Sequence, residues 1–276
     1  MMGLGDDERW LCPLPLSHVG GLMVVLRSAL MATTAVLVPP PFDPATVGAL
    51  MREREITTAS LVPTQLQRLL DADVPKPPAL RRILLGGGPM PHALLARARA
   101  AGYAVCPSYG LTQACSTVTI AEPGDVETHG RALPGVGIAI AGDGEILISG
   151  ATVNTLGALR TGDLGRITPD GRLVVLGRKG DVIITGGENV VPTEVEAVLA
   201  EHPGVAESAV FARPHPLWGE AVTALVVAKP GTELTQAALR KHCLERLAAF
   251  KVPKAFELTG ELPKTSSGKV RRADLR

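Results

Sequence analysis

The stretch GRKGDVIITGGENVVPTEVE, residues 177–196, is the most specific pattern in the chain, and it decides how the rest is interpreted. It contains, in order, a basic turn, a strand, a double-glycine loop and a helix that opens after a proline. We assign these to Gly177–Asp181, Asp181–Thr185, Gly186-Gly187 and Thr193–Glu201. Proline suits the first turn of a helix, because the backbone N–H that it lacks has no partner inside the helix there. The four signals in this order predict the start of a distinct C-terminal lobe.

The residues that follow mix strands and helices without an internal repeat. Strands are predicted over Val205–Arg213 and Val222–Lys229, a helix over Thr235–Phe250 and a short strand over Ala255–Leu258. This pattern predicts an α+β lobe over 178–276. The chain then ends in a polar loop that carries Lys269, for which a plain solvated tail is the alternative interpretation.

Before Gly177 the chain has two parts with different patterns. Over 1–121, helices alternate with short apolar strands, which favours a largely parallel sheet with helices on its faces. The predicted helices are Leu22–Ala32, Pro44–Glu53, Pro63–Asp71 and Pro91–Ala101, and the strands are Ala35–Val38, Thr58–Leu61, Ile83–Leu85 and Ala104–Cys106. Over 122–177, short strands at Gly137–Ile140, Gly144–Ile148, Leu164–Ile167 and Arg172–Leu176 are separated by turns such as Asp143-Gly144 and Asp170-Gly171. These residues indicate a small β-rich subdomain, which closes an N-terminal domain over 1–177.

The composition excludes several classes of protein. With 276 residues, of which 46% are hydrophobic and 20% charged, the chain can form one large or two ordinary globular domains. A net charge of +1 and only 3% aromatic residues argue against a nucleic-acid-binding protein. The four cysteines form no CxxC pair, so neither a metal site nor a disulfide framework is expected. The acidic start and the interrupted apolar runs predict a cytoplasmic protein with no membrane span.

Three short motifs carry side chains or backbone suited to a nucleotide. Tyr109-Gly110-Leu111-Thr112-Gln113 follows a predicted strand of the parallel sheet, and ligands bind at the carboxyl ends of such strands. Gly86-Gly87-Gly88-Pro89 also follows a strand, and glycines let a flat ligand approach the backbone. In Thr161-Gly162-Asp163, an ionised carboxylate can accept hydrogen bonds from both hydroxyls of a ribose. Taken singly, each motif is also compatible with an ordinary turn.

In their order along the chain, these motifs resemble those of the adenylate-forming superfamily, which includes acyl-CoA synthetases and the adenylation domains of peptide synthetases. The resemblance covers almost the whole chain. It implies that Gly86, Gly87 and Gly88 flank an adenine, and that Tyr109 and Thr112 bind the nucleotide. It further implies that Asp163 binds the ribose and that Arg178 lies beside a hinge.

The family reaction uses ATP, Mg²⁺ and coenzyme A to convert a small carboxylic acid into a thioester. The resemblance implies that His18, Thr112 and Lys269 are catalytic, with His18 also lining the acyl pocket. It places the hinge of a mobile C-terminal lobe at Gly180, where the family usually has Asp or Lys, and the coenzyme A tunnel at Gly186 and Gly187. Gln113 stands where the family has a Glu that helps hold Mg²⁺. An amide oxygen is a weaker ligand for this cation than a carboxylate.

Within the superfamily, three stretches resemble the o-succinylbenzoate–CoA ligases of menaquinone biosynthesis. They are His18–Leu22 with Arg27-Ser28, Leu84–Pro89 and Gly186–Val190. Arg27 lies in an apolar helical segment, and a buried guanidinium without a partner is costly. It could form a bidentate pair with the carboxylate of o-succinylbenzoate that is not activated. The alternatives are that Arg27 reaches solvent or pairs with a local acid.

Two further departures from the family pattern remain. The segment Ser149–Leu159 is shorter than usual, and no Ser/Thr/Gly-rich phosphate loop precedes His18. We therefore expect the fold class to be α/β, with a partial N-terminal region, a parallel-sheet layer plus a β-rich subdomain, followed by the C-terminal lobe. The chain would be the C-terminal part of a longer ligase. A non-catalytic relative that binds nucleotide or coenzyme A, another acyl- or aryl-CoA ligase, a partner N-terminal chain and a homo-oligomer stay open.

Overall fold

A computed structural model describes residues 7–155, 157–265 and 270–275. The chain divides into two compact units, which are described separately. Unit 1 comprises Met1–Thr161 and Gly165–Val175, and unit 2 comprises Gly162–Leu164 and Leu176–Arg276. The domain boundary expected between Gly177 and Arg178 stays a prediction.

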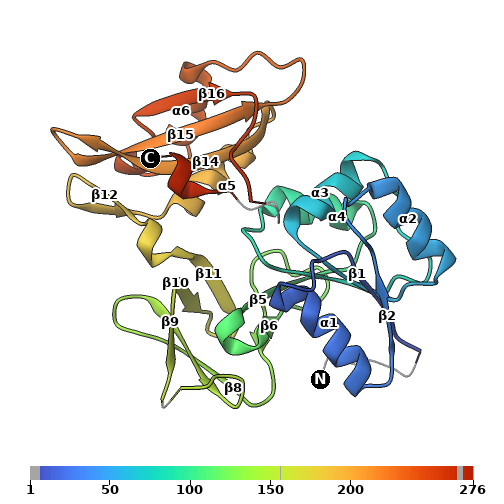
Figure 1. The fold of residues 1–276 in the computed structure, drawn as a ribbon. Helices are drawn as coiled ribbons and strands as arrows, with labels where there is room; N and C mark the ends of the chain where they lie inside the picture. Colours follow the sequence, from blue (N-terminus) through green and yellow to red (C-terminus); the bar gives the residue numbers. More distant parts are fainter. Residues whose placement is uncertain (1–6, 156, 266–269, 276) are drawn as a thin grey trace. The chain divides into compact units, whose positions relative to one another are not determined.

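Unit 1 is built on a seven-stranded sheet with the strand order β2-β1-β3-β4-β5-β6-β7 (Figure 1). The neighbouring pairs from β2 to β5 are parallel, whereas β6 and β7 are added antiparallel. The strands are β1 (Arg9–Cys12), β2 (Thr34–Leu37), β3 (Thr58–Leu61), β4 (Arg82–Leu85), β5 (Val105–Leu111), β6 (Ser116–Ile120) and β7 (Arg131–Ala132). Helices α1 (Val19–Leu30), α2 (Pro44–Glu53), α3 (Pro63–Asp71) and α4 (His92–Ala100) connect the parallel strands. The predicted α/β layer with a largely parallel sheet is thus confirmed.

The two faces of this sheet are covered by different helices. Leu11 of β1 belongs to a core cluster with residues of α2, α3 and α4, such as Met51, Leu66 and Leu95. Its neighbour in the strand, Trp10, belongs to a second cluster with Val24 of α1. Successive side chains of a strand point to opposite faces, so α1 lies on one face and α2–α4 lie on the other. This places α1 against the face of the sheet that includes Ile120 of β6.

A four-stranded sheet with the order β11-β10-β9-β8 follows. Its strands are β8 (Val136–Ile140), β9 (Glu145–Gly150), β10 (Leu159–Ile167) and β11 (Leu173–Arg178). The predicted turns at Asp143-Gly144 and Asp170-Gly171 are present, and both glycines have a left-handed φ of +82°. Ile146 and Ile148 of β9 form a core cluster with Val118 of β6, so this sheet packs onto the end of unit 1 that carries β5 and β6.

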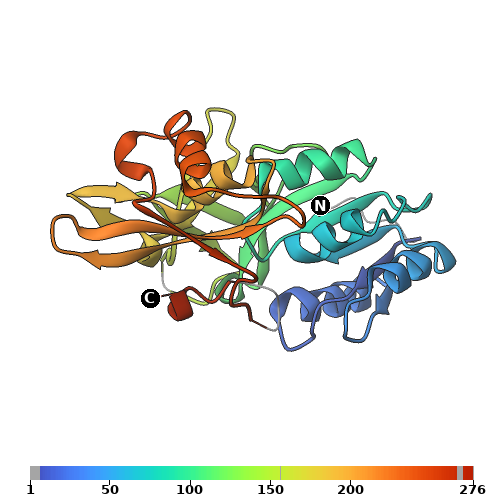
Figure 2. The ribbon, with the colours of Figure 1, turned by 90° about the horizontal axis from the view of Figure 1, so that it is seen from above.

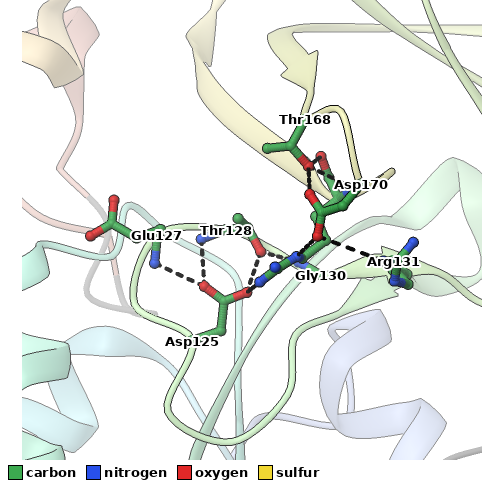
Figure 3. A network of polar contacts seen from close by, with 8 residues as sticks. Asp125, Glu127, Thr128, Gly130, Arg131, Thr168 and Asp170 are labelled. Atoms are coloured by element: carbon green, nitrogen blue, oxygen red, sulfur yellow. Dashed lines mark hydrogen bonds and ion pairs between the residues drawn. The ribbon is translucent and has the colours of Figure 1, made fainter.

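A polar network fixes the segment between β6 and β7 to the turn between β10 and β11 (Figure 3). Asp125 accepts hydrogen bonds from the backbone N–H groups of Glu127 and Thr128, both at 3.0 Å, and its Oδ2 lies 3.1 Å from Nη1 of Arg172. Arg172 also pairs with Asp170 at 2.5 Å. Hydrogen bonds from Thr168 and Arg172 lower the pKa of Asp170 to about 2. These contacts therefore hold the β6–β7 segment and the β10–β11 turn together within unit 1.

Unit 2 contains a five-stranded sheet in which β13, β12, β15 and β14 lie in that order and β16 pairs with β15. The strands are β12 (Ile183–Thr185), β13 (Glu188–Val190), β14 (Val205–His215), β15 (Gly219–Ala228) and β16 (Ala255–Thr259). Strands β14 and β15 form a long hairpin (Figure 2). Helices α5 (Pro192–Ala200) and α6 (Gln236–Leu244) contribute Val195, Leu199, Leu239 and Cys243 to the core. The expected α+β lobe is confirmed.

Some elements differ from the sequence prediction. Strands β1, β6, β7 and β13 were not predicted, and β5 extends to Leu111 instead of ending near Cys106. Helix α6 ends at Leu244 although residues up to Phe250 favour a helix by propensity. Leu247 and Phe250 pack against the core of unit 2, and tertiary packing of this kind overrides helix propensity. No helix in the described parts of the chain has the length and apolar character needed to cross a membrane.

Candidate active site

Tyr109 lies inside β5, not after it as the sequence predicted. Strand β5 leaves its parallel neighbour β4 and continues as the antiparallel partner of β6, with a register irregularity between Tyr109 and Gly110. Tyr109 is only 8% exposed. A Cβ atom on Gly110 would lie 1.9 Å from the backbone oxygen of Ser116, so only glycine fits between the two strands here. The first half of the motif is therefore fixed by the sheet.

The second half of the motif forms a short exposed turn. Thr112–Ala114 is a 3₁₀ turn, closed by the hydrogen bond from the N–H of Cys115 to the carbonyl of Thr112 at 3.1 Å. Thr112 and Gln113 are exposed, whereas Ala114 is buried. The buried Ala114 thus fixes this turn, and the Thr112 hydroxyl and the Gln113 amide are exposed on it.

The glycine loop Gly86–Gly88 lies beside the same strand. It follows β4, and β4 pairs with β5 with Leu85 opposite Pro107. The Ser108 hydroxyl donates to the carbonyl of Leu85 at 2.8 Å, and a Cβ atom on Gly86 would lie 2.8 Å from this hydroxyl oxygen. Gly87 has a φ of +81°, which favours glycine. The structure therefore brings the glycine loop and the Tyr109 motif to neighbouring strand ends.

His18 and Arg27 are both carried by the α1 segment. His18 is the exposed N-cap residue of α1, and its side chain makes no capping hydrogen bond. Arg27 is half-buried in the last turn of α1. Its Nη1 donates to Oγ1 of Thr117 in β6 at 3.4 Å, and burial lowers the pKa of Arg27. Among the described residues, no carboxylate forms an ion pair with it.

Of the residues with buried hydroxyls on α1 and β6, the sequence analysis noted Ser28 but missed Thr117 and Thr119. Ser28 is 3% exposed and Thr119 is fully buried, yet neither hydroxyl has a hydrogen-bond partner in the described part of the chain. Thr117 and Thr119 lie on β6 and Ser28 on α1. The alternation of polar and apolar residues in Ser116–Ile120 is the signal that could have revealed this strand. Arg27 and Thr117 are in contact and Ser28 follows Arg27 in α1; these three residues, here called the Arg27 cluster, offer hydrogen-bond donors for an anionic group.

Unit 2 contains the predicted ribose and hinge residues. Nε of Arg178 lies 2.9 Å from Oδ1 of Asp163, and the side chain of Asp163 is 10% exposed. Arg178 is followed by the 3₁₀ turn Lys179–Asp181. Within this turn, a Cβ atom on Gly180 would meet no atom within 4 Å. The structure thus pairs Asp163 with Arg178 directly before the predicted hinge.

The double-glycine loop is the tip of the hairpin formed by β12 and β13. Thr185 and Glu188 are paired, so Gly186 and Gly187 form a two-residue turn with φ values of +59° and +87°. Two successive positive φ values are typical of the type I′ turn that suits a tight hairpin. The N–H of Gly186 donates to the carbonyl of Trp218 at 2.9 Å. Lys269, the predicted catalytic lysine, lies outside the described residues.

A metal ion at this site would be held mainly by a bound substrate and only in small part by protein side chains. The described residues contain no group of three or more His, Cys, Asp or Glu side chains that could hold a metal ion. Mg²⁺ is commonly bound through substrate phosphates and water with only one or two protein oxygens. The exposed amide of Gln113 can supply one such oxygen, so the residues present fit this mode of binding.

Comparisons with known proteins agree with these motifs. The family model described as AMP-binding enzyme matches residues 1–157, and the one described as AMP-binding enzyme C-terminal domain matches residues 194–269. The chain is 37% identical over 301 residues to a 2-succinylbenzoate–CoA ligase of Bacillus licheniformis and 35% identical over 294 residues to that of Listeria monocytogenes. These alignments cover 99% and 100% of this chain, but 62% of each relative.

Solved structures give the same result. The o-succinylbenzoate CoA synthetase (MenE) of Bacillus subtilis, in complex with its acyl-adenylate intermediate, is similar with a TM-score of 0.91 and 35% identity over 100% of this chain and 62% of that one. ATP-bound MatB from Rhodopseudomonas palustris has a TM-score of 0.89 and 32% identity over 98% of this chain and 60% of that one. The chain therefore spans somewhat less than two thirds of the length of these relatives. Since the AMP-binding enzyme model alone matches more than half of its residues, the chain belongs to the AMP-binding enzyme family.

Proposed function

We propose that this chain contributes to an ATP-dependent acid–CoA ligase that converts o-succinylbenzoate to its coenzyme A thioester, a reaction of menaquinone biosynthesis. Ligases of this name are among the relatives with 35–37% identity, and the acyl-adenylate is bound in the B. subtilis structure. The same proposal places the protein in the cytoplasm, with a second copy of this chain or a separate chain as its partner.

The Arg27 cluster is the observation that carries the choice of acid. A half-buried guanidinium with no ion-pair partner among the described residues is costly unless a ligand satisfies it, and so is the buried Ser28 hydroxyl beside it in the sequence, which lacks a hydrogen-bond partner. o-Succinylbenzoate has two carboxylates, one that is activated and one that stays charged. The latter can accept hydrogen bonds from Arg27 and a threonine hydroxyl. A monocarboxylic acid would leave the hydrogen-bonding groups of the Arg27 cluster without a partner.

The first step joins the acid to the nucleotide. A carboxylate oxygen of the succinyl group attacks the α-phosphorus of ATP, and the bond from this phosphorus to pyrophosphate breaks. The Gly86–Gly88 loop and Tyr109 offer a flat surface for adenine, Asp163 can accept the ribose hydroxyls, and Thr112 can donate to the α-phosphate. Lys269 would neutralise charge that develops between the carboxylate and the phosphate. These roles require alignment and electrostatic stabilisation by preorganised groups.

The glycines near Tyr109 differ in the space around them. A Cβ atom on Gly86 or Gly110 would meet Ser108 or Ser116 of the protein itself, whereas one on Gly88 would meet nothing closer than 3.7 Å, so the glycine loop is open to a flat ligand at Gly88. Mg²⁺, held by phosphate oxygens with the amide of Gln113, would neutralise charge on the phosphates.

The second step forms the thioester. The sulfur of coenzyme A attacks the acyl carbon, the bond from this carbon to the phosphate oxygen breaks, and AMP leaves. Rotation at Gly180 would remove Lys269 after the first step and bring the Gly186-Gly187 hairpin to the pantetheine. His18 at the start of α1 lines the acyl side in this proposal.

Pyrophosphate release tests the proposed function. The chain would be assayed alone and co-expressed with the part of the B. subtilis ligase that it does not cover, with the intact B. subtilis enzyme as the positive control. We expect little release by the chain alone, because it contains no phosphate loop. In the co-expressed sample, o-succinylbenzoate should stimulate release at least tenfold more than benzoate does.

The same assay separates the alternatives. The similarity to MatB, whose structure has ATP bound, supports ATP as a substrate but not the choice of acid, so a ligase for another carboxylic acid is the second candidate. Release stimulated by a different acid but not by o-succinylbenzoate would support that candidate. No release with any acid from a co-purified complex, while AMP still binds, would support a non-catalytic nucleotide-binding protein.

A further inference from the structure

Helix α1 is apolar on two opposite faces. Of its 12 residues, only Arg27 and Ser28 have polar side chains. The face that packs on the sheet contains the buried residues Gly21, Val24 and Ser28, at helical spacings of three and four. A helix on the surface of a soluble protein normally has a polar outer face, whereas a helix that is apolar all round is normally buried. The sequence of α1 is therefore typical of a helix that is covered on both sides.

The outer face of α1 exposes leucines where a surface helix would carry charges. Leu22, Leu26 and Leu30 recur at every fourth residue, so they form one stripe along the helix. Leu22 and Leu26 are each 43% exposed, and Leu30 is 85% exposed. Met31, the C-cap residue of α1, is exposed as well. Unit 1 thus leaves the second apolar face of this helix uncovered.

Strand β2 extends this apolar surface. Leu37 is exposed and lies two residues after Ala35, which packs with Val24 of α1. Side chains two residues apart in a strand point to the same face, so Leu37 is on the α1 side of the sheet. Figure 1 shows α1 and β2 side by side. The exposed side chains on these two elements, here called the α1 patch, are those of Leu22, Leu26, Leu30, Met31 and Leu37.

The surroundings of the α1 patch fit a protein partner. Twelve large hydrophobic side chains are exposed in the described part of the chain, and five of them belong to this patch, which is the kind of clustering that marks interaction sites. β2 is the last strand of its sheet, and among the described residues only β1 pairs with it. The backbone N–H and C=O groups along its other edge can pair with polypeptide, whereas lipid tails offer them no hydrogen bonds.

The alignments with relatives indicate which protein this is. The chain covers 62% of each ligase compared above, so more than a third of each relative lies outside the alignment. That part shares one enzyme with the counterparts of α1 and β2, which lie within the AMP-binding enzyme match over 1–157. We propose that the α1 patch is the interface that receives this uncovered part of the ligase, through an apolar surface of the partner. The inference rests on the proposed function, because it takes a ligase as the complete protein.

Recovery of a complex tests this interface. The 276-residue chain would be co-expressed with an affinity-tagged form of the part of the B. subtilis ligase that it does not cover, and the chain recovered on the tag would be measured. Leu26→Glu and Leu30→Glu place a charge in the patch, and Leu244→Glu is the matched control, since Leu244 is a 53% exposed leucine of α6 in unit 2. Leucine and glutamate have similar helix propensities, so all three variants should keep the melting temperature of the isolated chain. We expect each patch variant to lower recovery by about tenfold or more, and Leu244→Glu to leave it unchanged.

Equal recovery of the patch variants and the unchanged chain would overturn the proposal, as would no complex with the unchanged chain. Sedimentation equilibrium of the 276-residue chain alone tests the other occupant. A dimer that Leu26→Glu and Leu30→Glu convert to monomers would assign the patch to a second copy and would also overturn the proposal. Because recovery needs no catalysis, a complex that depends on the patch but releases no pyrophosphate with any acid would support the interface and contradict the proposed function.

Discussion

Arg27 is the residue at which the choice of substrate can be tested. The sequence analysis singled it out as a charge within an apolar helical segment, and the structure places it half-buried against Thr117. The sequence shows Ser28 beside Arg27, but it could not show the contact with Thr117, because that requires β6 to pair with β5 and to lie against α1. The position of a charge along a helix is readable from sequence, whereas the polar groups that surround it depend on tertiary structure.

Replacing Arg27 with Leu should weaken binding of a hydrolysis-resistant o-succinylbenzoyl adenylate about 30-fold. The lost charge pair corresponds to about 2 kcal/mol, at the low end for a desolvated pair. The matching benzoyl adenylate should change less than threefold. Arg99→Leu, which removes an exposed arginine of α4, should leave both affinities unchanged. Titration calorimetry of the unchanged 276-residue chain and of both variants with the two adenylates measures these affinities, and an equal loss for both adenylates in Arg27→Leu would assign Arg27 a structural role.

His129 makes the stability of unit 1 depend on pH. Burial lowers its pKa from 6.5 to about 4, and its Nδ1 accepts the N–H of Val175 at 3.3 Å. The unfolded chain therefore binds a proton at this residue below about pH 6.5, whereas the folded chain does so only near pH 4. The free energy of unfolding should fall as the pH is lowered between these values, by up to about 1.4 kcal/mol per pH unit from this one group.

Urea unfolding of the unchanged chain and of His129→Gln from pH 7 to pH 4 checks this dependence. The variant should show a shallower slope over that interval, since glutamine does not titrate. The pKa of His202 is also lowered by burial. His202 is present in both proteins, so its contribution to the pH dependence of the free energy of unfolding is the same in both. Parallel slopes would show that His129 binds its proton equally well in both states.

At the scale of elements, the sequence predicted those helices and strands that have strong local signals. Helix α2 begins after Asp43, which accepts the N–H of Thr46 at 2.8 Å, and its predicted bounds are those observed. The bounds of β3 and α3 were also predicted correctly. In contrast, β6 and the extension of β5 depend on pairing with each other. Their sequence contains Pro107 and Gly110, which local propensity assigns to turns.

Gly130 is the glycine on which the connection between β6 and β7 depends. Its φ is +78°, and a Cβ atom on it would lie 1.8 Å from the backbone oxygen of Ile120. Gly135 has nearly the same φ, +79°, but a Cβ atom there would meet nothing within 4 Å. Alanine at Gly135 should therefore cost only the left-handed backbone conformation, about 1–2 kcal/mol. Gly130→Ala should cost at least about 2 kcal/mol more, because the backbone must also shift.

Equilibrium unfolding in urea measures the two variants side by side. The comparison is matched for backbone conformation, so the difference isolates the close approach to Ile120. If both variants lose the same free energy of unfolding, the network that fixes the 125–131 segment (Figure 3) tolerates displacement, contrary to the close packing described above.

At the scale of the whole molecule, the predicted site residues are divided between the two units. Unit 1 supplies His18, Arg27, the Gly86–Gly88 loop and the Tyr109 motif, whereas unit 2 supplies Asp163 and the residues that follow Arg178. The order of motifs along the chain was readable from the sequence, because each motif is local. The pairing of Asp163 with Arg178, and the ion pair of Arg272 with Glu196, join residues far apart in sequence and required the structure.

The central claim is that this chain binds the adenylate of an aromatic acid with a second carboxylate. The most direct measurement is titration calorimetry of the 276-residue chain with hydrolysis-resistant adenylates of o-succinylbenzoate and benzoate, with AMP as reference. The account predicts saturable binding of the o-succinylbenzoyl adenylate, at least tenfold tighter than that of the benzoyl adenylate. Equal affinity for the two adenylates, or no saturable binding of either by a folded chain, would contradict it.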